Sequence, residues 1–228
     1  MSLYLWIILS AFVGPLALSF DKKVHFYTYW KSIFFGIIVV APVFIFGDEL
    51  FTQWKVWGFN PSYVLGIYLG KLPLEEVLFF IIVPYNCLFI HEVHKAYFPN
   101  LKLETLTRYF LPLFGFICLL LIVFNWGNYY TLTYATTSLL LSAWFYFYKT
   151  PWFPSFVLTY LISILPFLIV NGILTGIFTP EPIVWYNEAH IVGWRIGTIP
   201  IEDLFYNFSM LLPIIWIHET FQSKIKNS

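Results

Sequence analysis

Seven apolar runs, each long enough to cross a membrane, occupy most of the 228-residue chain. A run of roughly 18 or more residues with few charges is typical of a transmembrane helix, because the hydrocarbon core of a bilayer is about 30 Å thick. The runs leave almost no sequence for a soluble domain. We therefore predict an all-α integral membrane protein with seven transmembrane helices, at about 3–20, 28–47, 73–91, 108–125, 129–148, 154–176 and 200–218.

The composition agrees with this class of protein. Hydrophobic residues make up 60% of the chain and charged residues only 11%, whereas a soluble domain averages about 25% charged residues. The net charge is zero, which argues against a nucleic-acid partner. Asp21, Lys22 and Lys23 follow the first run without a small-residue cleavage site, so we expect a retained helix and not a signal peptide.

The basic residues predict the orientation in the cell membrane. Cytoplasmic loops carry an excess of Lys and Arg. With seven spans, three basic residues fall on one side, Lys55, Lys71 and Arg195. Nine fall on the other: Lys22, Lys23, Lys31, Lys95, Lys102, Arg108, Lys149, Lys224 and Lys226. We therefore expect a multi-pass protein with its N-terminus outside and its C-terminus in the cytoplasm.

Two short acidic motifs, PLEE at 73–76 and PIED at 200–203, indicate an internal repeat in which position 73 corresponds to position 200. At this constant offset, eight of 33 positions are identical between 60–92 and 187–219, and most of these are Gly, Pro, Asn or acidic residues. Helices one to three then correspond to helices five to seven. Helices three and seven are four spans apart and cross in the same direction.

The predicted architecture is therefore two parallel three-helix repeats joined by a linker helix, and not the inverted repeats of many transporters. The expected boundaries are 1–95 for the first repeat, 96–127 for the linker helix and 128–228 for the second repeat.

The duplicated acids are the first candidates for chemistry. A proline and an acid also favour a helix start on their own, through the fixed φ of proline and the helix dipole. However, both copies carry two adjacent acids, and ionisable groups at membrane depth usually face a functional interior. The candidate catalytic residues are Glu75, Glu76, Glu202 and Asp203.

Supporting residues are expected around these acids. Asp48, at the end of helix two, is placed to join them, and Asn60 and Asn187 either bond to the acids or form turns. Helix three presents aromatic side chains beside its acids, whereas helix seven keeps polar ones, and ring faces stabilise cations. The supporting candidates are Asp48, Asn60, Asn187, Phe79, Phe80, Tyr206 and Asn207.

Other polar residues are assigned to structure. His91 with Glu92, and His218 with Glu219, recur at the opposite membrane face. We expect them to pair at helix ends and not to catalyse a reaction. The chain has no dinucleotide fingerprint and no phosphate-binding loop, and Cys87 and Cys118 lack metal-ligand spacing. We expect no cofactor and no metal.

The stretch GDELFTQWKVWGFNPSYVLGIYLGKLPLEEVLFFIIVP and its echo YNEAHIVGWRIGTIPIEDLFYNFSMLLPIIWIHE resemble the lycopene cyclase domain, in the fused form of the heterodimeric membrane carotenoid cyclases. In that family each three-helix unit carries a Pro-x-Glu-(Glu/Asp) motif, which matches 73–76 and 200–203. The resemblance implies an isomerase that closes ionone rings on linear lycopene without FAD-dependent chemistry. Its implied partners are lycopene and membrane lipid, with other carotenoid-pathway enzymes as candidates.

The residues suit such a reaction. Cyclisation needs a general acid, a carboxylate that stabilises a carbocation, aromatic walls and exclusion of water. Our hypothesis places the identical pair Glu75 and Glu202 at the centre, with Glu76, Asp203 and Asp48 tuning or relaying. The expected activity is lycopene β-cyclase, giving β-carotene via γ-carotene. The alternatives are an ε- or γ-ring cyclase, a carotenoid end-group hydratase and, from another class, a proton-coupled transporter.

Overall fold

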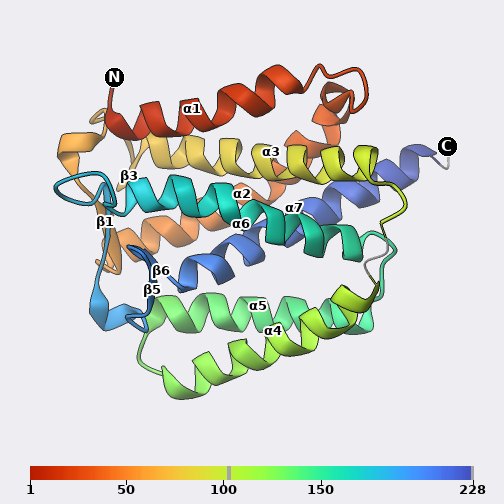
Figure 1. The fold of residues 1–228 in the computed structure, drawn as a ribbon. Helices are drawn as coiled ribbons and strands as arrows, with labels where there is room; N and C mark the ends of the chain where they lie inside the picture. The colour runs from red at the N-terminus through yellow and green to blue at the C-terminus, as the bar shows by residue number, and fades with distance from the viewer. Residues whose placement is uncertain (102–103, 227–228) are drawn as a thin grey trace.

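The structure, a computed structural model, describes residues 1–101 and 104–226. This part is mostly helical, and its seven α-helices run side by side as one bundle (Figure 1). Each corresponds to one of the apolar runs. The helices are α1 (Leu3–Leu18), α2 (Trp30–Gln53), α3 (Leu74–Tyr97), α4 (Glu104–Phe124), α5 (Tyr129–Phe147), α6 (Phe153–Leu174) and α7 (Glu202–Lys226).

Three helices continue beyond their apolar runs. α2 extends to Gln53, so Asp48 lies inside the helix and does not end it, and α3 extends to Tyr97. α7 likewise continues past 218. The added turns carry polar side chains that find partners inside the bundle, as described below. Hydropathy alone therefore ends these helices too early.

Four helical segments in the described part are long and apolar enough to cross a membrane: Phe26–Gln53, Leu74–Tyr97, Glu104–Phe124 and Phe153–Leu174. The first of them combines a short 3₁₀-helix (Phe26–Tyr29) with α2. α1 is a shorter apolar helix. α7 is less apolar because it carries buried polar residues, among them Asp203, Asn207 and His218.

We call α1 to α3 the first half of the molecule and α5 to α7 the second half, each with the loops and strands that connect its helices. The helices of the two halves pack between one another. α1 packs against α3, and α5 packs against α7, within each half. α2 packs against α7, and α6 packs against α3, so the middle helix of each half contacts the last helix of the other. α4 packs against α5 and α6 and lies at the edge of the bundle (Figure 1).

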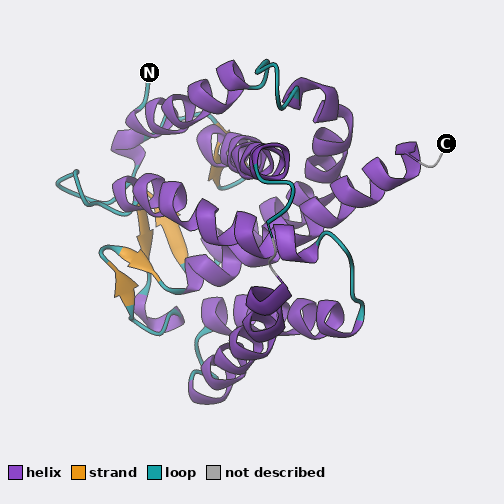
Figure 2. Cartoon of the chain, turned by 45° about the vertical axis from the view of Figure 1, so that its right-hand side comes forward, coloured by secondary structure: helices purple, strands orange, loops and turns teal. Residues whose placement is uncertain are grey.

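Short strands cover one end of the bundle, which we call the strand end (Figure 2). β1 (Trp57–Phe59) pairs antiparallel with β4 (Val184–Tyr186), so Trp57 lies opposite Tyr186 and Phe59 opposite Val184. The offset that relates the two acidic motifs also relates these strands, because it pairs 57 with 184 and 59 with 186. Each half therefore contributes the same strand to the pair.

Two hairpins flank this pair, β2 (Tyr68–Leu69) with β3 (Leu72–Pro73) and β5 (Arg195–Ile196) with β6 (Ile199–Pro200). Gly70 and Gly197 occupy their turns with φ of +65° and +64°. Such positive φ values favour glycine, which explains why glycine stands at both positions. The hairpins lead directly into α3 and α7.

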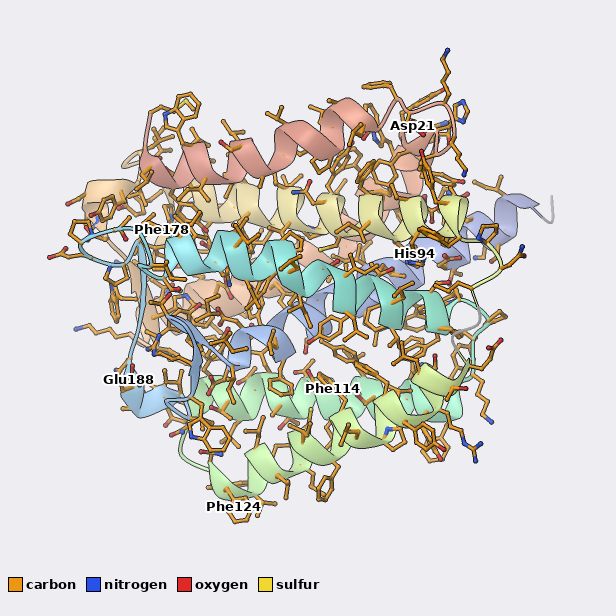
Figure 3. All side chains as sticks on the ribbon, in the orientation of Figure 1. Asp21, His94, Phe114, Phe124, Phe178 and Glu188 are labelled. Carbon is orange, nitrogen blue, oxygen red and sulfur yellow. The ribbon has the colours of Figure 1, made fainter. Side chains whose placement is uncertain are left out.

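The opposite end of the bundle carries most of the basic residues, and we call it the basic end. Figure 3 shows Asp21 and His94 at this end, and Glu188 and Phe178 at the strand end. Lys102 belongs to the same predicted side but lies outside the described residues. The basic end is defined by Lys22, Lys23, Lys31, Lys95, Arg108, Lys149 and Lys224.

Candidate active site

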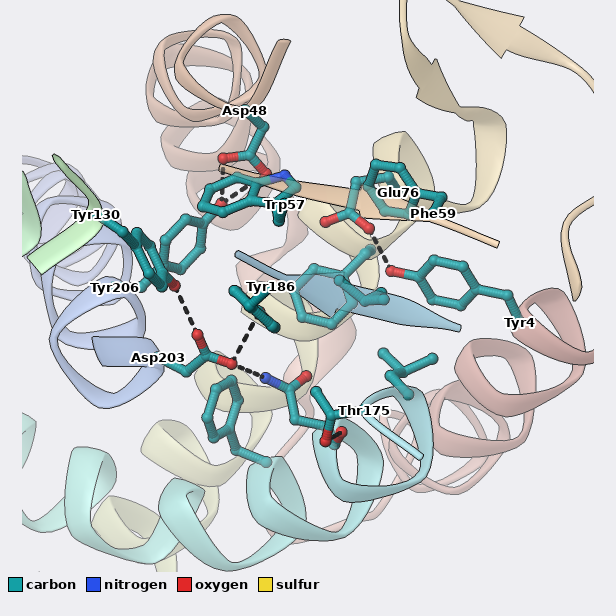
Figure 4. A pocket seen from close by; sticks show the side chains of 15 residues that line it. Tyr4, Asp48, Trp57, Phe59, Glu76, Tyr130, Thr175, Tyr186, Asp203 and Tyr206 are labelled. Atoms are coloured by element: carbon teal, nitrogen blue, oxygen red, sulfur yellow. Dashed lines mark hydrogen bonds between the residues drawn. The ribbon is translucent and has the colours of Figure 1, made fainter. Parts of the chain in front are cut away.

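A small cavity lies beneath the β1–β4 pair, where the two halves meet (Figure 4). Three acidic side chains line it, one each from α2, α3 and α7, and all three are buried. Both halves contribute to the other walls. The lining residues are Tyr4, Asp48, Trp57, Phe59, Glu76, Phe79, Tyr130, Phe167, Asn171, Leu174, Thr175, Val184, Tyr186, Asp203 and Tyr206.

Asp203 is the most extensively bonded of the three acids. The Tyr130 hydroxyl donates to its Oδ1 at 2.6 Å. Its Oδ2 accepts from Asn171 Nδ2 at 3.0 Å and from the Tyr186 hydroxyl at 3.1 Å. Burial raises the pKa of Tyr186, which lies outside the helices, well above its ordinary value, so this hydroxyl stays protonated and remains a donor.

Asp48 and Glu76 each receive hydrogen bonds from a single phenol. The Tyr206 hydroxyl lies 3.1 Å from both carboxylate oxygens of Asp48. The Tyr4 hydroxyl donates to Glu76 Oε2. The two acids come from α2 and α3 of the first half, whereas Asp203 comes from α7 of the second. The cavity is therefore a shared site with unequal contributions.

Glu75 and Glu202 do not line the cavity, which differs from our expectation that they form its centre. Glu75 Oε1 accepts from the Leu65 backbone N–H at 2.7 Å. Glu202 Oε1 accepts from the Val192 backbone N–H at 2.6 Å. Both acids thus fasten the preceding loop to the start of their helix. Neighbouring residues on a helix point about 100° apart, so only the second acid of each motif faces the cavity.

Two hydroxyl groups donate further hydrogen bonds to Glu75 and Glu202. Ser2 Oγ donates to Glu75, and Thr131 Oγ1 donates to Glu202 at 2.6 Å. The second oxygen of each glutamate is buried without a hydrogen-bond partner among the described residues. The two halves therefore use the first acid of the motif in the same way.

The remaining predicted residues divide into two groups. Phe79 and Tyr206 line the cavity. Phe80 is fully buried beside it, with its ring centroid 6.4 Å from that of Tyr206. Asn207 is also buried, but neither its amide oxygen nor its nitrogen has a partner in the described structure.

Asn60 and Asn187 form turns, which was one of the two alternatives. Asn60 Oδ1 accepts from the Ser62 backbone N–H, and Asn187 Oδ1 accepts from that of Ala189, each at 3.0 Å. Their amide nitrogens donate to Glu181 Oε2 and to the Lys55 carbonyl oxygen. Neither asparagine reaches an acid of the cavity.

Several residues that bond to the acids were not among the predicted site residues, above all Tyr4, Tyr130, Asn171 and Tyr186. They lie on α1, α5, α6 and β4, outside the two acidic motifs. Asn171 gave a usable signal, because an amide within the apolar run 154–176 is costly unless it is paired. The tyrosines gave none among 16 tyrosines in the chain.

A second polar cluster lies at the basic end, where α3 and α7 meet. His91 Nε2 contacts Glu219 Oε1 at 2.8 Å, and His218 Nε2 contacts Glu92 Oε1 at 3.0 Å. Each histidine therefore pairs with the glutamate of the other half. Lys95 Nζ donates to Glu92 at 2.8 Å and also to Glu219. The expected pairing at helix ends is present, and it joins the halves.

Hydroxyl groups fix the orientation of both rings. The Thr159 hydroxyl donates to the Ser155 carbonyl, so it accepts from His91 Nδ1 at 2.7 Å. The Ser32 hydroxyl donates to the Tyr29 carbonyl, so it accepts from His218 Nδ1 at 2.9 Å. Each ring is therefore held between a hydroxyl group at Nδ1 and a glutamate at Nε2.

A metal ion is the other species that such a cluster of histidine and glutamate side chains can hold. Ligand atoms of His91, Glu92 and Glu219 lie within 4.8 Å of one another. However, the Lys95 ammonium group already bridges the two glutamates at this place. The cluster is therefore an ion-pair network centred on Lys95.

The cavity itself has a volume of about 50 Å³, which is room for roughly four water molecules. An isoprenoid end group is much larger than this. Aromatic and aliphatic walls surround the three acids of the cavity. Such a site can donate and accept protons and stabilise a cation over ring faces while limiting water.

Comparison with known proteins identifies the family. The family model for lycopene cyclase matches residues 1–94 and 127–221, which together make up most of the chain. The two segments contain all three acids that line the cavity and both acidic motifs. No curated protein and no solved structure gives a significant match. Because the match extends over far more than half of its length, the chain belongs to the lycopene cyclase family.

Proposed function

We propose that the protein is a membrane lycopene β-cyclase, an isomerase that converts linear lycopene to β-carotene through γ-carotene. The observation that carries this proposal is the meeting of Asp48, Glu76 and Asp203 in one buried, aromatic-walled cavity. The family match supports a carotenoid cyclase in general, and the cavity supplies the acids and walls that the reaction needs.

The reaction proceeds in three steps. A carboxylic acid adds a proton to the terminal double bond of lycopene and leaves a tertiary carbocation. The neighbouring alkene attacks this cation with its electron pair and closes the ring. A carboxylate then removes a ring proton to form the new double bond. One proton is gained and one is lost, so the product is an isomer and no oxidant is used.

The hydrogen bonds suggest how the roles are divided. Donors to a carboxylate favour its charged form, and Asp203 has three of them. Asp203 is therefore assigned as the carboxylate that stabilises the cation and accepts the proton. The proton donor comes from the pair Asp48 and Glu76, each of which has one phenol partner among the described residues. Glu75 and Glu202 hold the loops that close the site.

A single shared site processes the two ends of lycopene in turn. Corresponding positions of the two repeats are not equivalent here: Asp48 corresponds to Thr175, and Phe79 to Tyr206. Two independent sites would each need a full set of acids, whereas the acids of both halves converge on one cavity. The monocyclic product γ-carotene therefore has to leave the cavity and enter it again with its uncyclised end first. This makes γ-carotene an intermediate of the reaction.

The proposal includes the arrangement in the membrane. All seven helices span the bilayer, as two parallel repeats joined by α4, with the strand end outside and the basic end in the cytoplasm. The recurrence of the strands, hairpins and fastened loops at corresponding positions of the two halves supports the repeat. The excess of basic residues at one end supports the orientation.

Expression in a lycopene-accumulating host tests the function. Wild-type protein should yield β-carotene, with γ-carotene appearing first. Asp48→Asn, Glu76→Gln and Asp203→Asn should each leave lycopene largely unconverted, whereas Glu49→Gln, beside Asp48 but outside the cavity, should convert it. Full conversion by the three cavity variants would overturn the proposal. A hydroxylated product would indicate a hydratase.

A further inference from the structure

A groove far from the acid cavity opens on the flank of the bundle, at the basic end. It is formed by the start of α4, the end of α5 and the start of α6. Its volume is about 860 Å³, which lies within the range of ligand pockets, about 300–1,000 Å³. The walls are largely apolar, with Leu111, Pro112, Phe145, Phe147 and Phe153 among them.

The groove continues along α4 and α5 toward the middle of the bundle. A second hollow of about 380 Å³ shares Leu111, Pro112, Tyr146 and Phe147 with the first and extends to Leu119. From Arg108 to Leu119 the helix rises about 16 Å. This length matches one leaflet of the hydrocarbon core, which is about half of 30 Å. The groove and the second hollow together therefore have the length of an acyl chain that fills one leaflet.

The polar end of the groove favours an anion. Arg108 and Lys149 both line it. Glu104 lines it too, one helical turn before Arg108, and offsets one of the two positive charges. α6 begins here with Pro154 in its first turn, and the positive end of its dipole adds to the attraction.

Two orphan hydroxyl groups lie along the same path. Thr150 Oγ1, at the polar end, is buried without a partner among the described residues. Ser142 Oγ is also unpartnered, on a residue that is only 2% exposed and lines the second hollow. Buried hydroxyl groups are normally hydrogen-bonded. Ser142 lies about 7.5 Å along α5 from the last residue of the helix at the basic end, so the ester carbonyl group of a lipid whose head group sits at that end can act as its acceptor.

Helix α4 has the least protein contact of the candidate spans. Only 17% of its apolar window is buried, against 39%, 56% and 44% for the other three. An occupant of the groove would fill the space between α4, α5 and the start of α6. The occupant must bring a negative group, a polar linker and a long apolar chain, in that order.

We propose that this groove binds one anionic glycerophospholipid. Its phosphate lies at Arg108 and Lys149, its ester region lies near Ser142, and one acyl chain follows α4 past Gly115 toward Leu119. This inference does not depend on the proposed reaction, because it concerns a different surface and a different ligand.

The first experiment compares protein in nanodiscs of dioleoyl phosphatidylcholine with and without dioleoyl phosphatidylglycerol. Phosphatidylglycerol should raise the melting temperature of the wild-type protein, and native mass spectrometry should detect one retained copy. The double variant Arg108→Gln/Lys149→Gln should lose the rise. Removal of each of the two cationic side chains should lower the affinity for phosphatidylglycerol about fivefold. Melting in pure phosphatidylcholine shows whether the variant is folded.

A control with matched charge separates the groove from the surface. Lys22→Gln/Lys31→Gln removes two exposed charges from the same end but none from the groove. This control should retain the lipid as the wild type does. Equal loss in both double variants would overturn the proposal, because it would indicate general attraction to a charged membrane.

A steric variant tests the acyl path. A Cβ at Gly115 would meet Leu139 Cδ1 at 3.6 Å, which is an ordinary contact, so Gly115→Ala should be tolerated. Gly115→Leu should fill the second hollow and reduce lipid retention. Stabilisation by inorganic phosphate in detergent to the same degree would reduce the site to a simple anion site. Retention of a carotenoid in place of the phospholipid would also overturn the assignment.

Discussion

At the scale of single residues, the two acids of each motif have different surroundings although they are neighbours in sequence. Glu76 faces the cavity, whereas Glu75 accepts from the Leu65 backbone N–H and from Ser2. A buried hydrogen bond to a charged group contributes about 1.5–3 kcal/mol. One acid of the pair therefore serves the loop, and the other is free for chemistry.

The first prediction compares these neighbours. Glu75→Gln keeps an amide oxygen that can accept from Leu65, so we expect most of the cyclase activity to remain. Glu76→Gln removes a titratable group from the cavity and should abolish most conversion of lycopene. Carotenoid analysis of cells expressing each variant at equal protein level provides the comparison. Loss of activity in Glu75→Gln with full activity in Glu76→Gln would restore Glu75 as the central acid.

The second prediction concerns the donors to Asp203. Tyr130→Phe removes the shortest hydrogen bond to this carboxylate, and we expect the turnover rate to fall about tenfold, which corresponds to roughly 1.4 kcal/mol. Tyr134→Phe is a matched control, because the ring centroids of Tyr134 and Tyr130 lie 5.2 Å apart but Tyr134 does not line the cavity. Initial rates with lycopene in detergent or nanodiscs give the result. Equal rates for both variants would remove Tyr130 from the assignment.

At the scale of elements, the ends of α3 and α7 hold the halves together at the basic end. The two histidine–glutamate pairs cross between these helices, and Lys95 contacts both glutamates. The hydroxyl groups of Ser32 on α2 and Thr159 on α6 orient the rings. This arrangement ties four helices together at the end opposite the cavity.

The third prediction is a coupling energy across this junction. His91→Gln and Glu219→Gln should each destabilise the protein, and the double variant should be more stable than the sum of the two effects implies. We expect a coupling of about 0.5–3 kcal/mol. His91→Gln combined with Glu188→Gln, at the exposed strand end, should be additive. Unfolding of the wild type and of every single and double variant in a denaturant series gives both cycles, and additivity in the first would contradict the pairing.

At the scale of the whole molecule, the two halves depend on each other. α2 packs against α7 and α6 against α3, and β1 pairs with β4 above the cavity. The acids of the cavity come from both halves. Neither half can therefore form the complete site, although each contributes one acidic motif.

The fourth prediction follows from this interdependence. A chain divided into 1–101 and 102–228 should regain cyclase activity when both pieces are co-expressed, because the contacts between halves do not need the connection before α4. Each piece alone should leave lycopene unconverted. The measurement is the carotenoid content of three strains, which express piece 1–101, piece 102–228 or both. Activity from a single piece would contradict a shared site.

The family, the number of helices and the approximate position of each follow from the amino-acid sequence without further information. Apolar runs predict helices because a run long enough to cross a bilayer is typical of a helix. The glycines of the hairpins and the acidic motifs revealed the correspondence between 60–92 and 187–219, since each has a local reason to recur. These features depend on neighbours along the chain, and the sequence contains them directly.

The selection of the acids that share the cavity depends instead on how the helices pack. The rotation of α3 and α7 about their axes turns Glu76 and Asp203 inward and leaves Glu75 and Glu202 at the loops. Packing between helices sets that rotation, and it also brings Asn171 to Asp203 from another helix. Adjacent residues differ by about 100° around a helix, so a rotation of that size would exchange their roles, and no local pattern in the sequence records which rotation the packing selects.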